Sequence, residues 1–477
     1  MKPRFWILAA LLLVCGAYAQ NLPDLGDSSS SALSSIDEQR LGESIMLDIR
    51  RDPAYLDDPE VADYVNRLGG RLTAASDSAR QSFEFFVVND PQINAFALPG
   101  GYIGLNTGLL LAAQSESEVA GVVGHEIAHV TQKHIARMVN QQSATQLVPL
   151  AALAVAILAA RSNSQVGEAA MAFGTASAVQ SQLNFTRAAE QEADRVGLQL
   201  VTAAGFDPQG MANFFGRLQR ATRAYDGGAP SYLRTHPLTT DRIADIENRI
   251  HNLPYRQVPD TLEFQLVRAK LRATGHNARE AIAFFEEGLR EKKYLSEAAG
   301  RYGLTVAFLR EKQFDKAKAQ LKQLAAIEHP MVESLKCRMV ESAGQGGAAA
   351  DCYRTALGRY PDSRALFYGL ADGLLKSGQA AAALALIEPR LRLQTADLRL
   401  YRMKAEAHAV LGQVLPQYRA LAEAHVRSGQ LALAVEQLQI GLKSGKGDFY
   451  EMSAAEARLR ELRKRLAEQL RSRESSR

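Results

Sequence analysis

The sequence has little of what a nucleic-acid-binding protein needs. The chain has 477 residues with a single Trp, and aromatic residues make up 7% of it. Lys and Arg total 56 against 52 Asp and Glu, so the formal net charge is +4. A chain this close to neutral gives no electrostatic reason to expect a nucleic-acid partner, and so few aromatic side chains offer no platform for stacking bases. The length favours two or more domains over a single core.

The sequence also lacks an apolar run long enough to span a membrane comfortably. The first apolar run, Phe5–Val14, follows the basic residues Lys2 and Arg4. It is followed by Ala17-Tyr18-Ala19, which places small residues at the two positions that a signal peptidase reads. We therefore expect residues 1–19 to be a signal peptide that is cleaved before Gln20. An uncleaved membrane anchor is the alternative.

Cysteine is scarce, with three residues in the chain. The residue before Cys15 is Val14, whereas a lipoprotein would carry a small residue at that position, so a lipid anchor is disfavoured. If Cys15 leaves with the signal peptide, Cys337 and Cys352 remain, fifteen residues apart. An exported chain meets oxidising conditions, which permits a disulfide between them. Two buried free thiols are the open alternative.

The first half of the chain carries the signals of a mixed α and β domain. A Ser-, Asp- and Gly-rich stretch over 21–35 indicates a flexible linker. Ser115 and Glu118 match a capping box, which predicts a helix that continues through His129 towards Asn140. The apolar segment Leu147–Ala160 is too short to span a bilayer, which leaves a buried helix, a lid or a membrane-touching element. The patterns also predict helices over 37–51, 59–75 and 187–203, a strand over 83–88 and a hairpin over 94–104.

From about Pro259 onward, the sequence indicates repeated helical units. The pairs Gly344-Gln345, Gly378-Gln379 and Gly412-Gln413 recur at a spacing of 34 residues. That is the length of a tetratricopeptide (TPR) repeat, a two-helix unit that stacks into a solenoid with a concave binding face. The Trp and Pro marks of a strong consensus are missing, so an irregular helical bundle remains the alternative.

The residues His125-Glu126-Ile127-Ala128-His129 carry the clearest chemical signal. Two His four positions apart on a helix lie on one face and can bind one zinc ion. Glu126 lies about 100° round the helix from His125, where it can act as a base on water without being a ligand. His134 would lie about 180° from His125 on one continuous helix, so it is not expected to share the metal.

A catalytic zinc needs a third protein ligand. Glu190 and Asp194 lie four residues apart on the helix expected over 187–203, so they share a face, whereas Glu192 points elsewhere. Glu190 is a candidate ligand, and Asp194 a candidate to orient a ligand His. Spacing alone does not decide this, because an acidic cluster is more often a solvated helix face.

The pattern of His125-Glu-x-x-His129 followed by Glu190-x-x-Ala-Asp194 resembles the HtpX-like zinc peptidases. These are gluzincins, in which two His and a downstream Glu bind zinc. Asn94–Gly104 and Thr235-His236-Pro237-Leu238 also look like this family. A secreted protease domain followed by TPR-like helices is similar to the periplasmic branch of the family, the BepA-type protease–chaperones of Gram-negative bacteria.

The resemblance implies a role for each matching residue. His125, His129 and Glu190 would be the zinc ligands. Glu126 would be the general base, and Asp194 would support the ligand shell. His236 matches a loop histidine that can occupy the fourth zinc position and keep the enzyme latent. Asn94–Gly104 would hold an edge strand that pairs with the substrate backbone.

The expected protein is thus an α+β, mostly helical zinc metalloendopeptidase with a small sheet in residues 20–255, followed by a TPR-like α-solenoid in 256–477. The resemblance implies a periplasmic location. It also implies misassembled outer-membrane β-barrel proteins as substrates, with the barrel assembly machinery and the lipopolysaccharide-transport barrel as contacts. A TPR chaperone or scaffold with a structural or silenced zinc site is the alternative function. A membrane-embedded protease, which would need Leu147–Ala160 to insert, is a third.

Overall fold

The structure is a computed structural model that describes residues 34–76, 81–141, 187–224, 231–254, 256–275, 277–344 and 346–475. The expected signal peptide, most of the linker and the apolar segment Leu147–Ala160 lie outside these ranges. No helix within them combines the length and the apolar character needed to cross a membrane.

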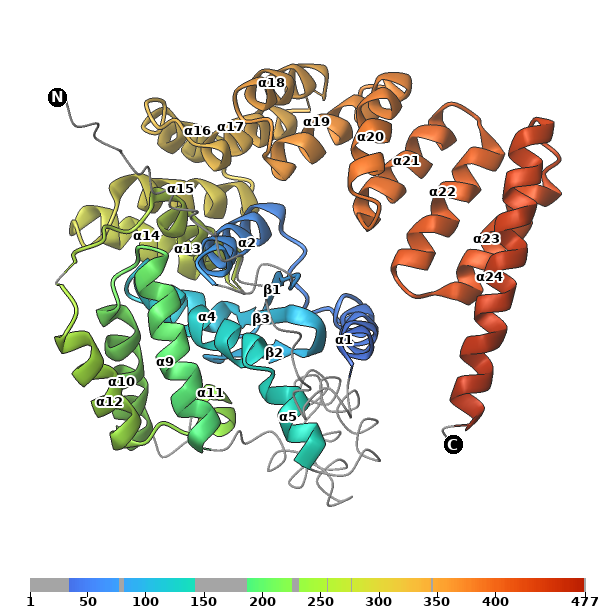
Figure 1. Cartoon of the computed structure of the whole chain (residues 1–477). Coiled ribbons are helices and arrows are strands. Elements are labelled where there is room, and N and C mark those ends of the chain that lie inside the picture. The colour runs from blue at the N-terminus through green and yellow to red at the C-terminus, as the bar shows by residue number, and fades with distance from the viewer. Residues whose placement is uncertain are drawn as a thin grey trace, which may run out of the picture.

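A three-stranded sheet lies at the centre of the first half of the chain (Figure 1). Its order is β1 (Glu84–Val88), β3 (Tyr102–Asn106), β2 (Ala95–Leu98), so β2 lies at one edge. β3 pairs parallel with β1 and antiparallel with β2, which confirms the predicted hairpin. Gly100 and Gly101, between β2 and β3, have φ angles of 79° and 85°, a conformation that only glycine adopts readily.

Helix α4 (Glu116–Thr131) packs against this sheet, and every residue from Glu116 to Val130 is buried. Its N-cap is Ser115, whose hydroxyl accepts a hydrogen bond from the Glu118 amide, as predicted. The other helices of this half of the chain are α1 (Ser35–Ile49), α2 (Pro59–Ala74), α3 (Thr107–Ala112), α5 (His134–Gln141), α9 (Arg187–Ala203), α10 (Gln209–Ala224), α11 (Ser231–Thr235) and α12 (Thr240–His251).

The prediction of one helix through His129 to Asn140 is wrong at one point. α4 ends at Thr131, and α5 begins at His134 after a break in which Lys133 has a φ of 52°. The predicted helix over 187–203 has the bounds of α9, and the other predicted helices agree with α1 and α2 to within two residues.

The second half of the chain consists of helices whose sequence neighbours pack against each other. Gly344, Gly378 and Gly412 lie in the turns after α17, α19 and α21, with φ angles of 76°, 77° and 69°. The recurring glycine therefore ends one helix of each pair in a left-handed turn. The helices are α13 (Leu262–Thr274), α14 (Ala278–Arg290), α15 (Glu297–Arg310), α16 (Phe314–Lys322), α17 (Pro330–Ser342), α18 (Gly346–Arg359), α19 (Arg364–Lys376), α20 (Ala380–Leu393), α21 (Leu398–Val410), α22 (Val414–Arg427), α23 (Leu431–Lys443) and α24 (Phe449–Ser475).

Cys337 and Cys352 form a disulfide that joins α17 to α18. Of the two alternatives left open by the sequence, pairing is therefore the one that the structure contains.

The two halves of the chain contact each other extensively. The repeat helices run in an arc past α2 and then down beside α1 (Figure 1). Asp63 of α2 pairs with Arg364 of α19, and the Arg51 guanidinium donates to the Ser428 carbonyl oxygen over 2.7 Å. The predicted domain boundary at 255/256 falls between α12 and α13 and stays a prediction, because the largest hydrophobic cluster includes residues on both sides of it, such as Leu200 and Phe264.

Candidate metal centre

Helix α4 brings His125 and His129 together in the interior of the first half of the chain. Both side chains are fully buried, and their Nε2 atoms lie 3.0 Å apart. This is the arrangement that the four-residue spacing on one helix predicts. Nothing else on α4 places a ligand beside them, so the remaining groups come from other elements.

Helix α9 supplies Glu190, because it lies unusually close to α4. Gly124 of α4 and Gly197 of α9 face each other, and a Cβ added to Gly197 would lie 2.9 Å from the His125 amide nitrogen. The absence of both side chains lets the two backbones approach, as at other small-residue contacts. Glu190, two turns before Gly197, is thereby held over the two imidazoles.

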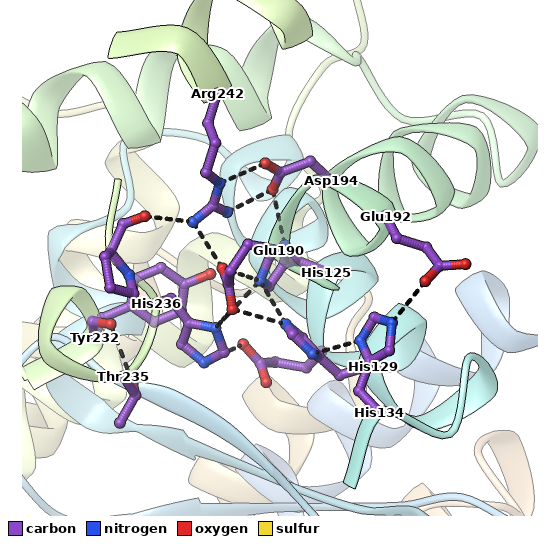
Figure 2. A network of polar contacts seen from close by, with 12 residues as sticks. His125, His129, His134, Glu190, Glu192, Asp194, Tyr232, Thr235, His236 and Arg242 are labelled. Carbon is purple, nitrogen blue, oxygen red and sulfur yellow. Dashed lines mark hydrogen bonds and ion pairs between the residues drawn. The ribbon is translucent and has the colours of Figure 1, made fainter. Parts of the chain in front are cut away.

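His236 enters from the segment between α11 and α12. It is 2% exposed, and its ring stacks on that of Tyr232, with centroids 4.8 Å apart. The Arg242 guanidinium donates to the Pro237 carbonyl oxygen over 2.8 Å, which fixes the residue next to His236. Figure 2 shows His236 pointing at the same point as Glu190 and His125.

Four ligand atoms from these residues form a compact, buried group whose members lie within 4.8 Å of one another. His125 Nε2 lies 3.0 Å from His129 Nε2 and 3.3 Å from His236 Nδ1. Glu190 Oε1 lies 3.4 Å from His129 Nε2 and 3.0 Å from His236 Nδ1. Tetrahedral zinc with bonds of 2.0–2.1 Å separates its ligand atoms by about 3.3 Å. The spacing of these four pairs and the three-His, one-carboxylate donor set therefore fit a zinc ion.

Glu126 lies beside this group and is not part of it. Its carboxylate is fully buried, and its Oε1 lies 3.5 Å from His236 Nε2. Neither oxygen has a hydrogen bond of good geometry to the described residues. Burial raises the pKa of Glu126 above its usual range, against the lowering effect of His236 and His125. A buried carboxylate with a raised pKa next to a metal site is suited to accept a proton.

Asp194 lies behind His125, where the spacing to Glu190 had placed it as a candidate. Its Oδ1 is 3.0 Å from His125 Nδ1, on the side of the ring away from the ligand atoms. Burial would lower the pKa of His125, but hydrogen bonds to Asp194 and Glu190 outweigh it and raise that pKa to about 9. Burial would raise the pKa of Asp194, but contacts with Arg242 and His125 outweigh it, so this pKa is lowered.

All six residues singled out from the sequence thus meet at one place: Glu126, Asp194, His125, His129, Glu190 and His236.

Sequence reasoning missed three residues that support them. Arg242 forms ion pairs with both Glu190 and Asp194. Glu192 contacts His134, which in turn contacts His129. His134 is not among the four ligand atoms, as expected, but the reason given for it fails because α4 and α5 are separate helices. No local pattern in the sequence marks Arg242 or Glu192 as part of the site.

Comparisons with known proteins agree with this geometry. The model of peptidase family M48 matches residues 59–250. The chain is 32% identical over 98% of its length to the beta-barrel assembly-enhancing protease of Yersinia pestis, of which it covers 99%. It is 31% identical over 93% of its length to the protein of the same name from Escherichia coli (strain K12), of which it covers 92%. It is also 32% identical to the mitochondrial metalloendopeptidase OMA1 of Arabidopsis thaliana, over 46% of this chain and 43% of that one. The chain therefore belongs to the beta-barrel assembly-enhancing protease family, within peptidase family M48.

Proposed function

We propose that the protein is a zinc metalloendopeptidase in which His125, His129 and Glu190 bind the metal and His236 occupies its fourth position. The observation that carries this proposal is the group of four buried ligand atoms within 4.8 Å of one another, four pairs of which lie 3.0–3.4 Å apart. Three ligands from α4 and α9 are the set that catalytic zinc sites use, with one position left for water or substrate.

Zinc in such a site supplies a Lewis acid that polarises the scissile carbonyl and lowers the pKa of the attacking water. Glu126 would accept the proton of the attacking water, because its buried carboxylate lies at the edge of the ligand group. Protonated Glu126 then delivers the proton to the leaving amine. Asp194 keeps the proton of His125 on Nδ1, so that Nε2 is free for the metal.

His236 makes this form of the enzyme latent. A four-ligand site leaves no position for the attacking water, so hydrolysis requires His236 to move away. The histidine lies on a connecting segment between two helices, whereas the other three ligands lie on α4 and α9. Movement of that segment alone would open the fourth position and leave the other ligands in place.

Substrate backbone is expected to bind along β2. This strand lies at the edge of the sheet and packs against α4, which carries Glu126. An extended peptide that adds a strand to an exposed edge gains main-chain hydrogen bonds whatever its sequence.

The substrates we propose are misassembled outer-membrane β-barrel proteins in the periplasm. The names of the relatives, beta-barrel assembly-enhancing protease, support this. A stalled barrel exposes an unpaired strand edge, which is suited to pairing with β2. The barrel assembly machinery and the lipopolysaccharide-transport barrel are the proposed contacts of the TPR-like helices, whose stacked pairs form protein-binding surfaces. Residues 1–19, the expected signal peptide, would direct the chain there and then be removed.

The second candidate function is a TPR chaperone or scaffold with a structural zinc site. The observation that favours it is the burial of all four ligands, because structural zinc sites are closed by four protein groups. Glu126 separates the two functions. A structural zinc site does not need a proton acceptor, whereas Glu126 places a buried carboxylate without good hydrogen bonds beside the ligands.

The test is cleavage of an unfolded outer-membrane β-barrel protein by residues 20–477, with the wild type compared with His236→Ala. We expect one zinc per chain in both proteins and clearly faster cleavage by His236→Ala. Glu126→Gln is the matched control, because it should retain zinc and the fold but lose hydrolysis. Zinc binding without hydrolysis in both the wild type and His236→Ala would favour the scaffold function, and hydrolysis by Glu126→Gln would remove Glu126 as the base.

A further inference from the structure

The break between α4 and α5 places His134 in contact with the metal centre. On one continuous helix, His134 would lie about 140° round from His129, and the two rings would not meet. Lys133 has a φ of 52°, in the left-handed region that non-glycine residues rarely adopt. This residue breaks the helix between Thr131 and His134, and His134 Nδ1 lies 2.9 Å from His129 Nδ1.

His134 also contacts α9 on its other side. Its Nε2 lies 3.1 Å from Glu192 Oε2, and the Arg137 guanidinium donates to the same oxygen over 2.9 Å. His134 is 3% exposed, while the Glu192 side chain is 27% exposed. Figure 2 shows the resulting row, which runs from Glu192 through His134 to His129. Helix α9 therefore supplies both Glu192, at the end of this row, and the candidate ligand Glu190.

The contact between the two rings fixes where their protons lie. One nitrogen must donate and the other accept, because a bare pair or a doubly protonated pair would repel. A metal-binding imidazole keeps its proton on the nitrogen that faces away from the metal. His129 presents Nε2 to the other ligand atoms, so its proton lies on Nδ1 and is donated to His134.

The same reasoning extends to Glu192. If His134 accepts at Nδ1, its own proton lies on Nε2 and is donated to the Glu192 carboxylate. The opposite assignment would place the bare Nε2 of His134 3.1 Å from a carboxylate oxygen, with two acceptors facing each other. Glu192 therefore selects the direction of the whole row, and the direction it selects leaves Nε2 of His129 free for a metal.

We propose that His134 and Glu192 are positioning residues that set the tautomer and ring orientation of His129 for metal binding. This inference rests on the proposed function, since it takes His129 to be a ligand. The two His ligands on α4 would then be oriented in different ways. Asp194 contacts Nδ1 of His125 directly. Glu192 acts on Nδ1 of His129 through the ring of His134, which lies between them. Loss of a partner that orients a metal ligand typically weakens metal affinity about 10–100-fold.

The test is zinc affinity of residues 20–477, measured by competition with a chromophoric chelator, for His134→Leu and His134→Asn. Leu and Asn have the same branched shape, but Asn places a carbonyl oxygen where Nδ1 of His134 lies. We expect His134→Leu to weaken zinc affinity about 10–100-fold, and His134→Asn to restore it to within a few-fold of the wild type. His251→Leu, at an exposed position of α12, controls for loss of a histidine.

Equal zinc affinity of His134→Leu and the wild type would overturn the proposal, as would equal weakening by Leu and Asn. If His134→Leu does not fold, Glu192→Ala gives the answer, because that side chain is partly exposed. It should weaken zinc binding several-fold, and unchanged affinity would again overturn the proposal. Failure of the proposed metal site is distinguishable, because in that case the wild type itself would bind no zinc and His129→Ala would change nothing. Failure of hydrolysis alone would leave the zinc affinities, and therefore this test, unaffected.

Discussion

Arg242 and Asp194 form a two-pronged ion pair in the interior of the protein. Arg242 Nε donates to Asp194 Oδ2 and Nη2 donates to Oδ1, each over 2.7 Å, and both side chains are 2% exposed. Nη1 of the same guanidinium lies 2.7 Å from Glu190 Oε2. Burial opposes the charge of Arg242, but the hydrogen bonds to Asp194 outweigh it and raise its pKa. The Arg242 guanidinium therefore contacts both buried carboxylates, Glu190 and Asp194.

Arg242→Met should destabilise the metal-free protein by about 3–5 kcal/mol, because it removes the guanidinium that pairs with two buried carboxylates. Urea unfolding measures the change. Arg249→Met is the matched control on the same helix, since Arg249 pairs with Asp245 at the surface, where such pairs contribute about 0–1 kcal/mol. Equal stability of the two variants would show that the buried pair does not hold the site together.

The closeness of α4 and α9 leads to a second prediction. A methyl group at Gly197 would lie 2.9 Å from the His125 amide nitrogen and 3.0 Å from the Gly124 carbonyl carbon, both backbone atoms that cannot turn aside. Gly197→Ala should therefore separate the helices, cost about 1–3 kcal/mol in stability and weaken zinc binding, because Glu190 moves away from His125. Chelator competition and thermal unfolding measure the two effects.

The control for this prediction is Gly358→Ala in α18. Gly358 is exposed, and a methyl group there meets no atom within 4 Å. This substitution should leave zinc affinity unchanged and stabilise the helix by up to about 1 kcal/mol. If Gly197→Ala behaves in the same way, the glycine contact is not what brings Glu190 to the histidines.

The sequence predicted those parts of the site that depend on local order. The capped start of α4, the bounds of α9 and the shared face of His125 and His129 all follow from helix signals within a few residues. Glycine spacing located the turns of the repeat helices for the same reason. His236 was identified as a candidate ligand from a family motif and not from any physical pattern in its own segment.

What the sequence could not predict depends on contacts between distant segments. Lys133 ends α4 in a conformation for which glycine is the usual residue, so no signal marked the break. Glu192 does point away from Glu190, as its helix position indicates, but it meets His134 coming from α5. Arg242 gains its partners only when α12 packs against α9.

The raised pKa of His125 leads to a prediction on metal binding. With a pKa of about 9, its ring is charged at neutral pH in the metal-free protein. This charge stabilises the metal-free fold fully below the ordinary pKa of about 6.5, and the stabilisation is lost as pH rises through 9. A metal must displace that proton, so zinc binding should release about one proton at pH 7.5.

Apparent zinc affinity should accordingly rise about tenfold per pH unit between pH 7 and the pKa of His125. Calorimetry in buffers of different ionisation enthalpy counts the proton, and chelator competition follows the affinity. An ordinary pKa for His125 would instead give constant affinity above about pH 7.5 and no proton release. Asp194→Asn should move the dependence to lower pH, because it removes the carboxylate next to the ring.

The disulfide between Cys337 and Cys352 should stabilise the repeat helices through the unfolded chain that it constrains. Closing a loop of fifteen residues contributes about 3 kcal/mol in the chain-entropy account. Cys337→Ala/Cys352→Ala should lower the free energy of unfolding by that amount. Dithiothreitol should lower the stability of the wild type to the level of the variant and leave the variant unchanged.

Two thiols that react with maleimide in the unfolded, unreduced wild type would show that the pair is not joined. Zinc affinity should be the same with and without the disulfide, because α17 and α18 contribute no ligand to the metal centre.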